Sequence, residues 1–288
     1  MQFVTAIIQG VLLGGLYAIF AAGLSFMFGV MRLVNLAHGA LGVLAAYGTL
    51  WLVDAGVVSP LLALLIVVPV MAAIGYVLQR TVLQRTLSES PLPSLLVTFG
   101  IAIIIGNTLL ITQSANQQRL SLGWLDTASI RIGEIAIGVF PLIILAFAVL
   151  SLGTLSLVMA RTQFGRLVRS VSDDAPTVSL MGANPKHIYG IAAAIAFGLV
   201  AVAGVAGGAS SGFNPTSGDM FLIFAFEAVI IGGLGSLWGT LLGAIILGVV
   251  QTVVGVVDPG LQQLAGHIVF LIFLIFLPNG LIARKVRA

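Results

Sequence analysis

The first long segment of this chain contains no charged side chain. Residues 4–29 read VTAIIQGVLLGGLYAIFAAGLSFMFG, which is longer than the about 20 apolar residues that an α-helix needs to cross a bilayer. Backbone polar groups in lipid must pair with one another, so a lone segment of this kind can cross only as a helix. No basic residues precede it and no small-residue cleavage site follows, which indicates a retained helix and not a signal peptide.

Composition extends this conclusion to the whole chain. Apolar residues make up 59% of the 288 residues and charged residues only 7%, against about 25% in a typical soluble domain. The mean hydropathy is +1.19. The chain has no cysteine, which excludes disulfides, thiolate metal sites and cysteine nucleophiles.

Nine apolar stretches predict an all-α polytopic membrane protein with a single transmembrane domain, residues 1–288. The second and seventh stretches are short enough to be half-helices or to be joined to polar flanks, so we expect about eight to ten transmembrane helices, some of them broken. The stretches are 4–29, 37–53, 59–79, 93–113, 136–158, 187–208, 219–233, 237–257 and 262–282.

The basic residues predict the orientation, because cytoplasmic loops carry an excess of Lys and Arg. With nine crossings and the N-terminus outside, only Arg119 and Arg131 lie outside, and the C-terminal tail is cytoplasmic. The other ten of the 12 basic residues then lie inside: Arg32, Arg80, Arg85, Arg161, Arg166, Arg169, Lys186, Arg284, Lys285 and Arg287.

The longest inner loop, residues 159–186, is the first candidate for a functional segment. Its SVSDDAPTVSLMG stretch could form one or two short amphipathic helices, with Asp173 or Asp174 near a helix start and Gly182 as the stop. The alternative is a solvated loop that carries only positive-inside charges.

Two pentapeptides share the pattern N-x-x-x-G: NLAHG at 35–39 and NPTSG at 214–218. Each follows a long apolar segment and precedes a short one, and five crossings separate them, so the two units have opposite orientations. Inverted repeats with broken helices place polar groups near the membrane midplane. We therefore hypothesise an inverted repeat whose two breaks line a translocation path, with Asn35, His38 and Asn214 as lining residues. The alternative is a chance match in a Gly-rich chain.

Glu227 is the one carboxylate in the middle of an apolar stretch, MFLIFAFEAVIIGG. An ionisable residue at membrane depth is a functional candidate. It could face a substrate path, carry a proton or pair with a basic group on a neighbouring helix, or it could be a protonated structural residue. The sequence contains no GxxxxGK[ST] loop, no HExxH motif and no cluster of histidines with carboxylates, so we expect neither an enzyme nor a metal site.

Three long stretches resemble the branched-chain amino-acid type of ABC transporter permease, in particular the shorter of its two permease subunits. They are GVLLGGLYAIFAAGLSFMFGVMRLVNLAHGAL (10–41), LMGANPKHIYGIAAAIAFGLVAVAGVAGG (180–208) and FEAVIIGGLGSLWGTLLGAIILG (226–248). The resemblance covers nearly the whole chain. It implies a bacterial inner-membrane importer in which this chain binds no cofactor and partner subunits use ATP. The implied partners are a second permease, two cytoplasmic ATPase subunits and a periplasmic substrate-binding protein.

The resemblance also gives the 159–186 loop a role as the ATPase coupling loop. Asp174-Ala175 followed by Gly182 is similar to the EAA…G loop of ABC permeases, with Pro176 in place of the second Ala and a longer gap before the Gly. The implied contact residues are Arg166, Arg169, Asp173, Asp174 and Gly182.

The implied substrates are leucine, isoleucine or valine, while relatives import urea, short amides and other amino acids. A rival interpretation is an ion-coupled secondary transporter of small polar solutes that works without an ATPase. Glu227 would suit it, but the long inner loop would have no role in it.

Overall fold

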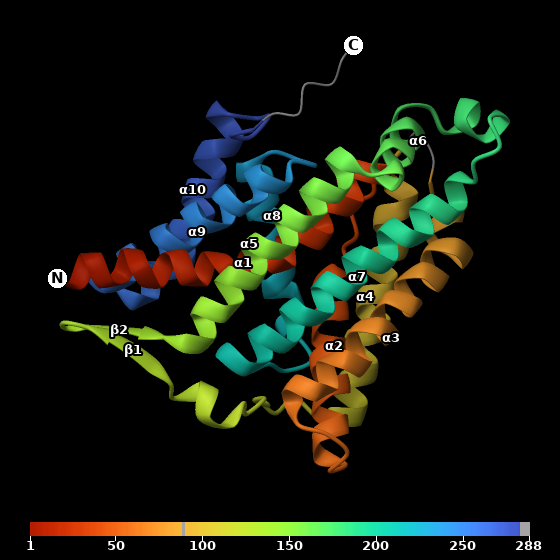
Figure 1. The fold of residues 1–288 in the computed structure, drawn as a ribbon. Coiled ribbons are helices and arrows are strands. Elements are labelled where there is room, and N and C mark those ends of the chain that lie inside the picture. Colours follow the sequence, from red (N-terminus) through yellow and green to blue (C-terminus); the bar gives the residue numbers. More distant parts are fainter. Residues whose placement is uncertain (88–89, 283–288) are drawn as a thin grey trace.

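The computed structural model describes residues 1–87 and 90–282. Helices dominate this part of the chain, and most of them run diagonally across the view in Figure 1. Ten α-helices are described: α1 Gln2–Met31, α2 His38–Asp54, α3 Pro60–Thr81, α4 Leu92–Gln113, α5 Val139–Arg161, α6 Gln163–Leu180, α7 Pro185–Ser210, α8 Ser217–Gly232, α9 Leu237–Val257 and α10 Gln262–Phe276.

Nine of these helices correspond to the nine predicted apolar stretches, and α6 forms within the inner loop. Seven of the nine are long and apolar enough to cross a membrane, α3 together with its 3-10 extension (η1, Leu83–Arg85) and α10 together with the preceding 3-10 turn (η3, Pro259–Leu261). The other two, α2 and α8, are the short stretches, at 17 and 16 residues. The expectation of a helical polytopic membrane protein is confirmed.

Glycines bring α1 and α9 into backbone contact. A Cβ added to Gly14 would lie 2.6 Å from the Cα of Ile245, and one added to Gly248 would lie 2.4 Å from the Gly10 carbonyl oxygen. Small residues one turn apart leave a flat helix face that permits this approach. Thr252 adds a hydrogen bond of 2.8 Å from its hydroxyl to the Ala6 carbonyl.

The helices α3 and α7 pack in the same close manner. A Cβ on Gly75 would lie 2.8 Å from the Ala193 carbonyl, and one on Gly190 would lie 2.7 Å from the Tyr76 ring. The pairs α1–α9 and α7–α3 have equivalent places in two units, α1 to α4 and α7 to α10. Each unit is a long helix, a break, a short helix and two further helices, which is the order expected of a repeat.

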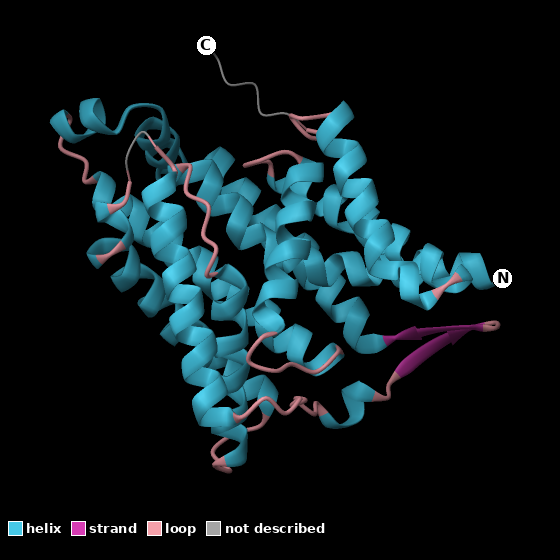
Figure 2. Cartoon of the chain, turned by 180° about the vertical axis from the view of Figure 1, so that it is seen from behind, coloured by secondary structure: helices cyan, strands magenta, loops and turns pink. Residues whose placement is uncertain are grey.

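A short β-hairpin extends from the outer loop, where the sequence predicts no regular structure. Strand β1 (Ser129–Ile132) pairs antiparallel with β2 (Ile135–Gly138) across a two-residue turn that has Gly133 at φ 62°. Alternating isoleucines flank a glycine turn here, the usual hairpin pattern. The preceding segment contains a 3-10 turn (η2, Gly123–Asp126), and Figure 2 shows the hairpin in magenta.

The same outer loop also covers the second helix break. The backbone N–H of Gln118 donates to the Phe213 carbonyl at 2.7 Å, and the Phe213 N–H donates back at 2.8 Å. Arg119 donates to the Ala209 carbonyl at 3.3 Å. These bonds close the outer end of α7, so the loop is part of the packed structure.

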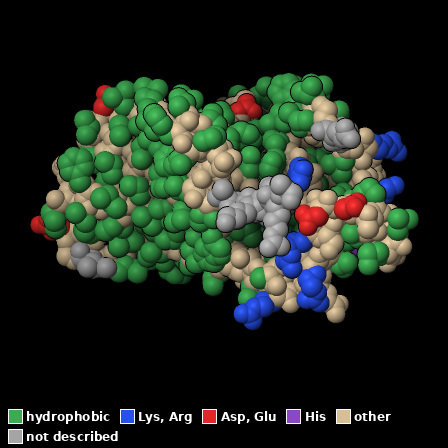
Figure 3. All heavy atoms as spheres, turned by 90° about the horizontal axis from the view of Figure 1, so that it is seen from above, with side chains coloured by type: hydrophobic (Ala, Val, Ile, Leu, Met, Phe, Trp, Pro, Cys, Tyr) green, Lys and Arg blue, Asp and Glu red, His purple; other side chains and the backbone are tan. Residues whose placement is uncertain are grey.

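Basic side chains gather at the opposite end of the molecule. In Figure 3, the view from above, Lys and Arg lie toward the α6 side, beside a broad apolar surface. Seven described basic residues belong to this end: Arg32, Arg80, Arg85, Arg161, Arg166, Arg169 and Lys186. Arg284, Lys285 and Arg287, which were predicted in the cytoplasmic tail, lie outside the described residues.

Candidate functional site

Both N-x-x-x-G segments are helix breaks, and they have the same local geometry. The Asn35 side-chain oxygen accepts from the Ala37 N–H at 3.0 Å, and the Asn35 carbonyl accepts from His38 N–H at 3.1 Å. In the second segment the Asn214 side chain accepts from the Thr216 N–H at 3.0 Å, and its carbonyl accepts from Ser217 N–H at 3.1 Å. Each asparagine forms a turn that starts the short helix after it.

The two breaks meet inside the protein. A Cβ on Gly39 would lie 1.9 Å from the Gly218 carbonyl oxygen, and one on Gly218 would lie 2.8 Å from the Ala40 nitrogen. The short helices α2 and α8 therefore cross backbone to backbone at the glycines of the two pentapeptides. The two pentapeptides therefore form one contact inside the protein, which is the arrangement that the hypothesis of an inverted repeat requires.

His38 connects this crossing to α1. Its Nε2 lies 3.0 Å from the Phe20 carbonyl oxygen, and because a carbonyl only accepts, Nε2 carries the proton. Gly23 leaves room for the ring, since a Cβ there would lie 2.8 Å from the His38 Cε1. The histidine in NLAHG thus fixes the start of α2 against the neighbouring helix.

The structure brings the predicted lining residues Asn35, His38 and Asn214 to the two sides of this crossing. Asn35 and His38 are buried and Asn214 is half-buried. Each side chain makes hydrogen bonds within the protein, but Nδ2 of Asn35 and Nδ1 of His38 are buried without a partner in the described structure. Their role as path-lining residues stays a prediction.

Glu227 lies elsewhere, about 14 Å further along α8 from Gly218 at 1.5 Å per residue. Its Oε1 lies 2.5 Å from Nδ1 of His267 on α10, and the carboxyl group is buried. Of the options open from the sequence, the structure has Glu227 pairing with a basic group on a neighbouring helix.

Three residues that were not chosen as site residues complete the surroundings of this pair. The Tyr17 hydroxyl of α1 donates to the Gln251 side-chain oxygen of α9 at 2.7 Å. Phe224 lies between them and the imidazole, with its ring centroid 4.9 Å from Tyr17 and 6.1 Å from His267. Tyr17 and Gln251 are each a polar residue within an apolar stretch, and this isolation is the sequence signal by which they could have been chosen as site residues.

The predicted coupling loop folds as α6, which is amphipathic and bent. Its backbone leaves helical geometry at Asp174 (φ −150°, ψ 87°), directly before Pro176. Asp174 then caps the second half, because its carboxylate accepts from the Thr177 N–H at 3.0 Å and from the Thr177 hydroxyl. Pro176 lies in the first turn of this second half. Proline is tolerated there because the N–H that it lacks would have no acceptor within the helix.

The second half of α6 ends where the sequence predicts. Gly182 has φ +87°, a conformation that glycine adopts without steric cost, and it directly follows Met181. Leu180 and Met181 are 88% and 81% exposed, so two large apolar side chains stand free at the tip of the loop. Of the alternatives open from the sequence, one or two short helices that start near Asp173 or Asp174, the structure has a bend at Asp174 and a helix end directly before Gly182.

The charged residues of α6 differ in their contacts. Arg166 and Asp173 are exposed, whereas Arg169 donates to the Met159 carbonyl and connects α6 to the end of α5. The two hydrogen bonds from Thr177 lower the pKa of Asp174. A lowered pKa means that this cap is intact at neutral pH and is lost as the pH falls through the pKa of the folded state. Whether these residues contact an ATPase stays a prediction.

Comparisons with known proteins support one family along almost the full chain. A family model described as "Branched-chain amino acid transport system / permease component" matches residues 6–277. The high-affinity branched-chain amino acid transport system permease protein BraD of Pseudomonas aeruginosa is 25% identical over 98% of this chain and 96% of its own length.

The corresponding permease protein LivH of Salmonella typhimurium is 25% identical over 99% of this chain and 96% of its own. LivH of Escherichia coli is 24% identical over 99% of this chain and 96% of its own length. No solved structure matches the chain. With seven helices long and apolar enough to cross a membrane and a family match over residues 6–277, the chain belongs to the permease family of branched-chain amino acid transport systems.

Proposed function

We propose that this chain forms one half of the membrane channel of an ABC importer for branched-chain or related amino acids. Two cytoplasmic ATPase subunits would power it, a second permease would complete the channel, and a binding protein would deliver the substrate. The family match supports the permease assignment, and the curated relatives carry branched-chain amino acid transport in their names.

The bent α6 is the observation that carries the ATPase assignment. It presents exposed Leu180 and Met181 beyond the bundle, at the end where the basic residues gather. Apolar side chains that stand free on a short, capped helix are suited to insertion into a groove of a partner protein. The chain itself has no Walker A loop, so in this proposal ATP is hydrolysed by a separate subunit.

The same end faces the cytoplasm in this proposal. Seven described basic residues lie there, and only Arg119 and Arg131 lie at the other end. The positive-inside rule then puts the β-hairpin and the N-terminus on the outer, binding-protein side of a bacterial inner membrane, and the end of α10 on the cytoplasmic side.

The experiment that tests this function is uptake by the assembled complex. The tagged chain is purified from its native membranes, the co-purifying subunits are identified by mass spectrometry, and the complex is reconstituted into proteoliposomes with ATP inside. We expect a P-loop ATPase and a second permease to co-purify, and leucine uptake to need both ATP and the binding protein. Uptake by the chain alone, driven by an ion gradient, would instead support a secondary transporter.

A further inference from the structure

The feature that the proposed function leaves unexplained is a histidine on the side of a membrane helix that faces away from the helix bundle. The His267 side chain is 40% exposed on α10, between Leu264 and Leu271, which are also exposed. Ionisable residues in membrane helices almost always face the protein interior or a water-filled cavity, because lipid gives them no partner. The outward face of α10 is therefore covered by something polar in the working assembly.

Two buried polar atoms behind His267 lead to the same conclusion. Among the described residues, eight buried side-chain atoms have no hydrogen-bond partner, and two of them, Oε2 of Glu227 and Nε2 of Gln251, lie in this region. One is an acceptor and the other a donor, and both belong to the cluster formed by Tyr17, Gln251, Glu227 and His267. Buried polar groups are rarely left unpaired, and each orphan costs about 1–3 kcal/mol. Water or a polar solute is the natural partner for both.

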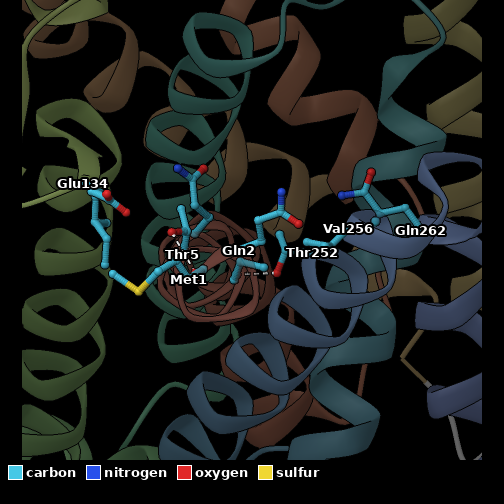
Figure 4. Close-up of a pocket in the computed structure, with 11 residues that line it drawn as sticks. Met1, Gln2, Thr5, Glu134, Thr252, Val256 and Gln262 are labelled. Atoms are coloured by element: carbon cyan, nitrogen blue, oxygen red, sulfur yellow. Dashed lines mark hydrogen bonds between the residues drawn. The ribbon is translucent and has the colours of Figure 1, made fainter.

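An outer pocket lies above this cluster on the same helices. Figure 4 shows Gln2, Thr252 and Gln262 around a cavity of about 650 Å³ between α1, α9, the start of α10 and the β-hairpin. Gln9 of α1 and Glu134 of the hairpin turn also line it. Six of the eleven lining residues have polar side chains, although the helices that supply most of them are apolar.

The pocket and the cluster lie one after the other along the helix axes. We call the two together the column: the pocket residues Gln9, Thr252 and Gln262, and the cluster of Tyr17, Gln251, Glu227 and His267. Gln262 in the pocket and His267 are five residues apart on α10, about 8 Å at 1.5 Å per residue. Gln9 and Tyr17 are eight residues apart on α1, about 12 Å, and Thr252 of the pocket is adjacent to Gln251. The outer pocket and the buried cluster thus lie on the same helices, about 8–12 Å apart along their axes.

We propose that this column is the outer half of the translocation path, that it runs along the outward face of α10 opposite the second permease, and that the Glu227–His267 pair receives the ammonium group of a zwitterionic amino acid. With Nδ1 donating to the Glu227 carboxylate, Nε2 of His267 is left as an acceptor directed away from it, and the carboxylate makes the site negative. This proposal rests on the proposed function and names a place for the path that neither the α2–α8 crossing nor α6 specifies.

The absence of cysteine from the chain makes a direct test simple, since every introduced cysteine is the only one in the chain. Three variants place it on the column: Gln262→Cys in the pocket, and Leu264→Cys and Leu271→Cys on the His267 face. The matched control is Ile104→Cys in the middle of α4, which is 67% exposed against 51% for Leu264 and 50% for Leu271. The assembled importer in right-side-out membrane vesicles is treated with a charged maleimide, and labelling rates are compared.

We expect all three column cysteines to react at least tenfold faster than the Ile104→Cys control. Leucine with its binding protein should slow labelling, and 4-methylpentanoate, which lacks the ammonium group, should not. If Leu264→Cys and Leu271→Cys react as slowly as the control while ATP-driven leucine uptake persists, the α10 path is overturned and the proposed function stands. If they react rapidly but leucine gives no protection, the water-filled path is supported and the ammonium site and the assigned substrate class are overturned.

Discussion

At the residue scale, the fold depends on positions where no side chain fits. The Gly39–Gly218 contact puts two backbones so close that even a methyl group would overlap a carbonyl oxygen. A backbone atom cannot rotate away as a long side chain can, so the surrounding helices would have to separate. The asparagines that start the two short helices have the opposite need, because their side-chain oxygens are required.

We predict that Gly39→Ala lowers the free energy of unfolding by ~1–3 kcal/mol, because α2 and α8 must move apart to accommodate the methyl group. Gly100→Ala is the matched control, since nothing lies within 4 Å of its added Cβ on α4. There the change should be neutral or stabilising by up to about 1 kcal/mol, through reduced backbone freedom. Thermal unfolding in detergent measures both, and equal melting temperatures for the two variants would contradict the tight crossing.

We predict that Asn214→Ala destabilises the turn before α8 by ~1 kcal/mol, the usual net contribution of a hydrogen bond to stability. Three donors on Thr216 and Ser217 lose their acceptor in this variant. Asn214→Asp keeps the oxygen at a half-buried position and should restore stability. Hydrogen exchange of the amides of residues 216–220 provides the measurement. Unchanged protection in the alanine variant would be evidence against a stabilising role of the Asn214 turn.

At the scale of elements, α6 packs against the bundle along one side and leaves its tip free. Valines on its inner side, Val168, Val171 and Val178, pack against the protein, while its tip stays free. The bend at Asp174 lets one short segment carry both the anchored half and the free half. A docking element benefits from this division, because the anchored half transmits force to the helices that it contacts.

We predict that Met181→Asp reduces co-purification of the ATPase at least tenfold, because a carboxylate would be buried in an apolar contact. Ser170→Asp is the control, a charge at an exposed position on the anchored half of the same helix. The amount of ATPase recovered per permease is read from quantitative mass spectrometry. Equal recovery with both variants would remove Leu180 and Met181 from the interface.

Charge reversal separates the two arginines of α6. Arg166 is free in the described structure, so Arg166→Glu should leave the melting temperature unchanged and weaken the coupling of ATP hydrolysis to uptake. Arg169 binds the Met159 carbonyl, so Arg169→Glu should lower the melting temperature as well. Uptake per ATP hydrolysed and thermal unfolding are measured together. A folding defect confined to Arg166→Glu would reverse this assignment.

At the scale of the whole molecule, two units of similar order are joined by α5 and α6. The long pairs α1–α9 and α7–α3 each contain one helix from each unit, so neither unit forms a closed core alone. Basic residues mark one end of this assembly, and the hairpin and the outer pocket mark the other. The difference between the two ends of the molecule therefore arises from residues spread along the whole chain.

The orientation predicts opposite labelling of two single cysteines. Trp124→Cys, 72% exposed in the outer loop, should react with an impermeant maleimide in intact spheroplasts. Met181→Cys at the α6 tip should react only after the membrane is permeabilised. The reverse pattern would place α6 outside and exclude it as the ATPase contact.

Local sequence signals predicted much of this structure. The nine apolar stretches each became a helix, and the turn chemistry of Asn35, Asn214, Asp174 and Gly182 placed breaks and stops correctly. These signals act within a few residues, so they can be read without knowledge of the packing.

Contacts between distant residues could not be predicted in the same way. The pairing of Glu227 with His267 depends on how α8 and α10 are rotated about their axes, and an apolar sequence leaves that rotation open. The same holds for the burial of Asn35 and His38, which followed from where α2 crosses α8. The hairpin was missed because its strands are only four residues each, SIRI and IAIG.

The crossing of Gly39 and Gly218 has a mechanical consequence. No side chain lies between the two backbones at this point, so no change of rotamer can absorb a local shift of α2 or α8. A tilt of one unit is passed to the other as through a rigid pivot, and packed interfaces change by discrete steps. We therefore expect α2 and α8 to move together in a transport cycle, as one rigid element and not as two independent gates.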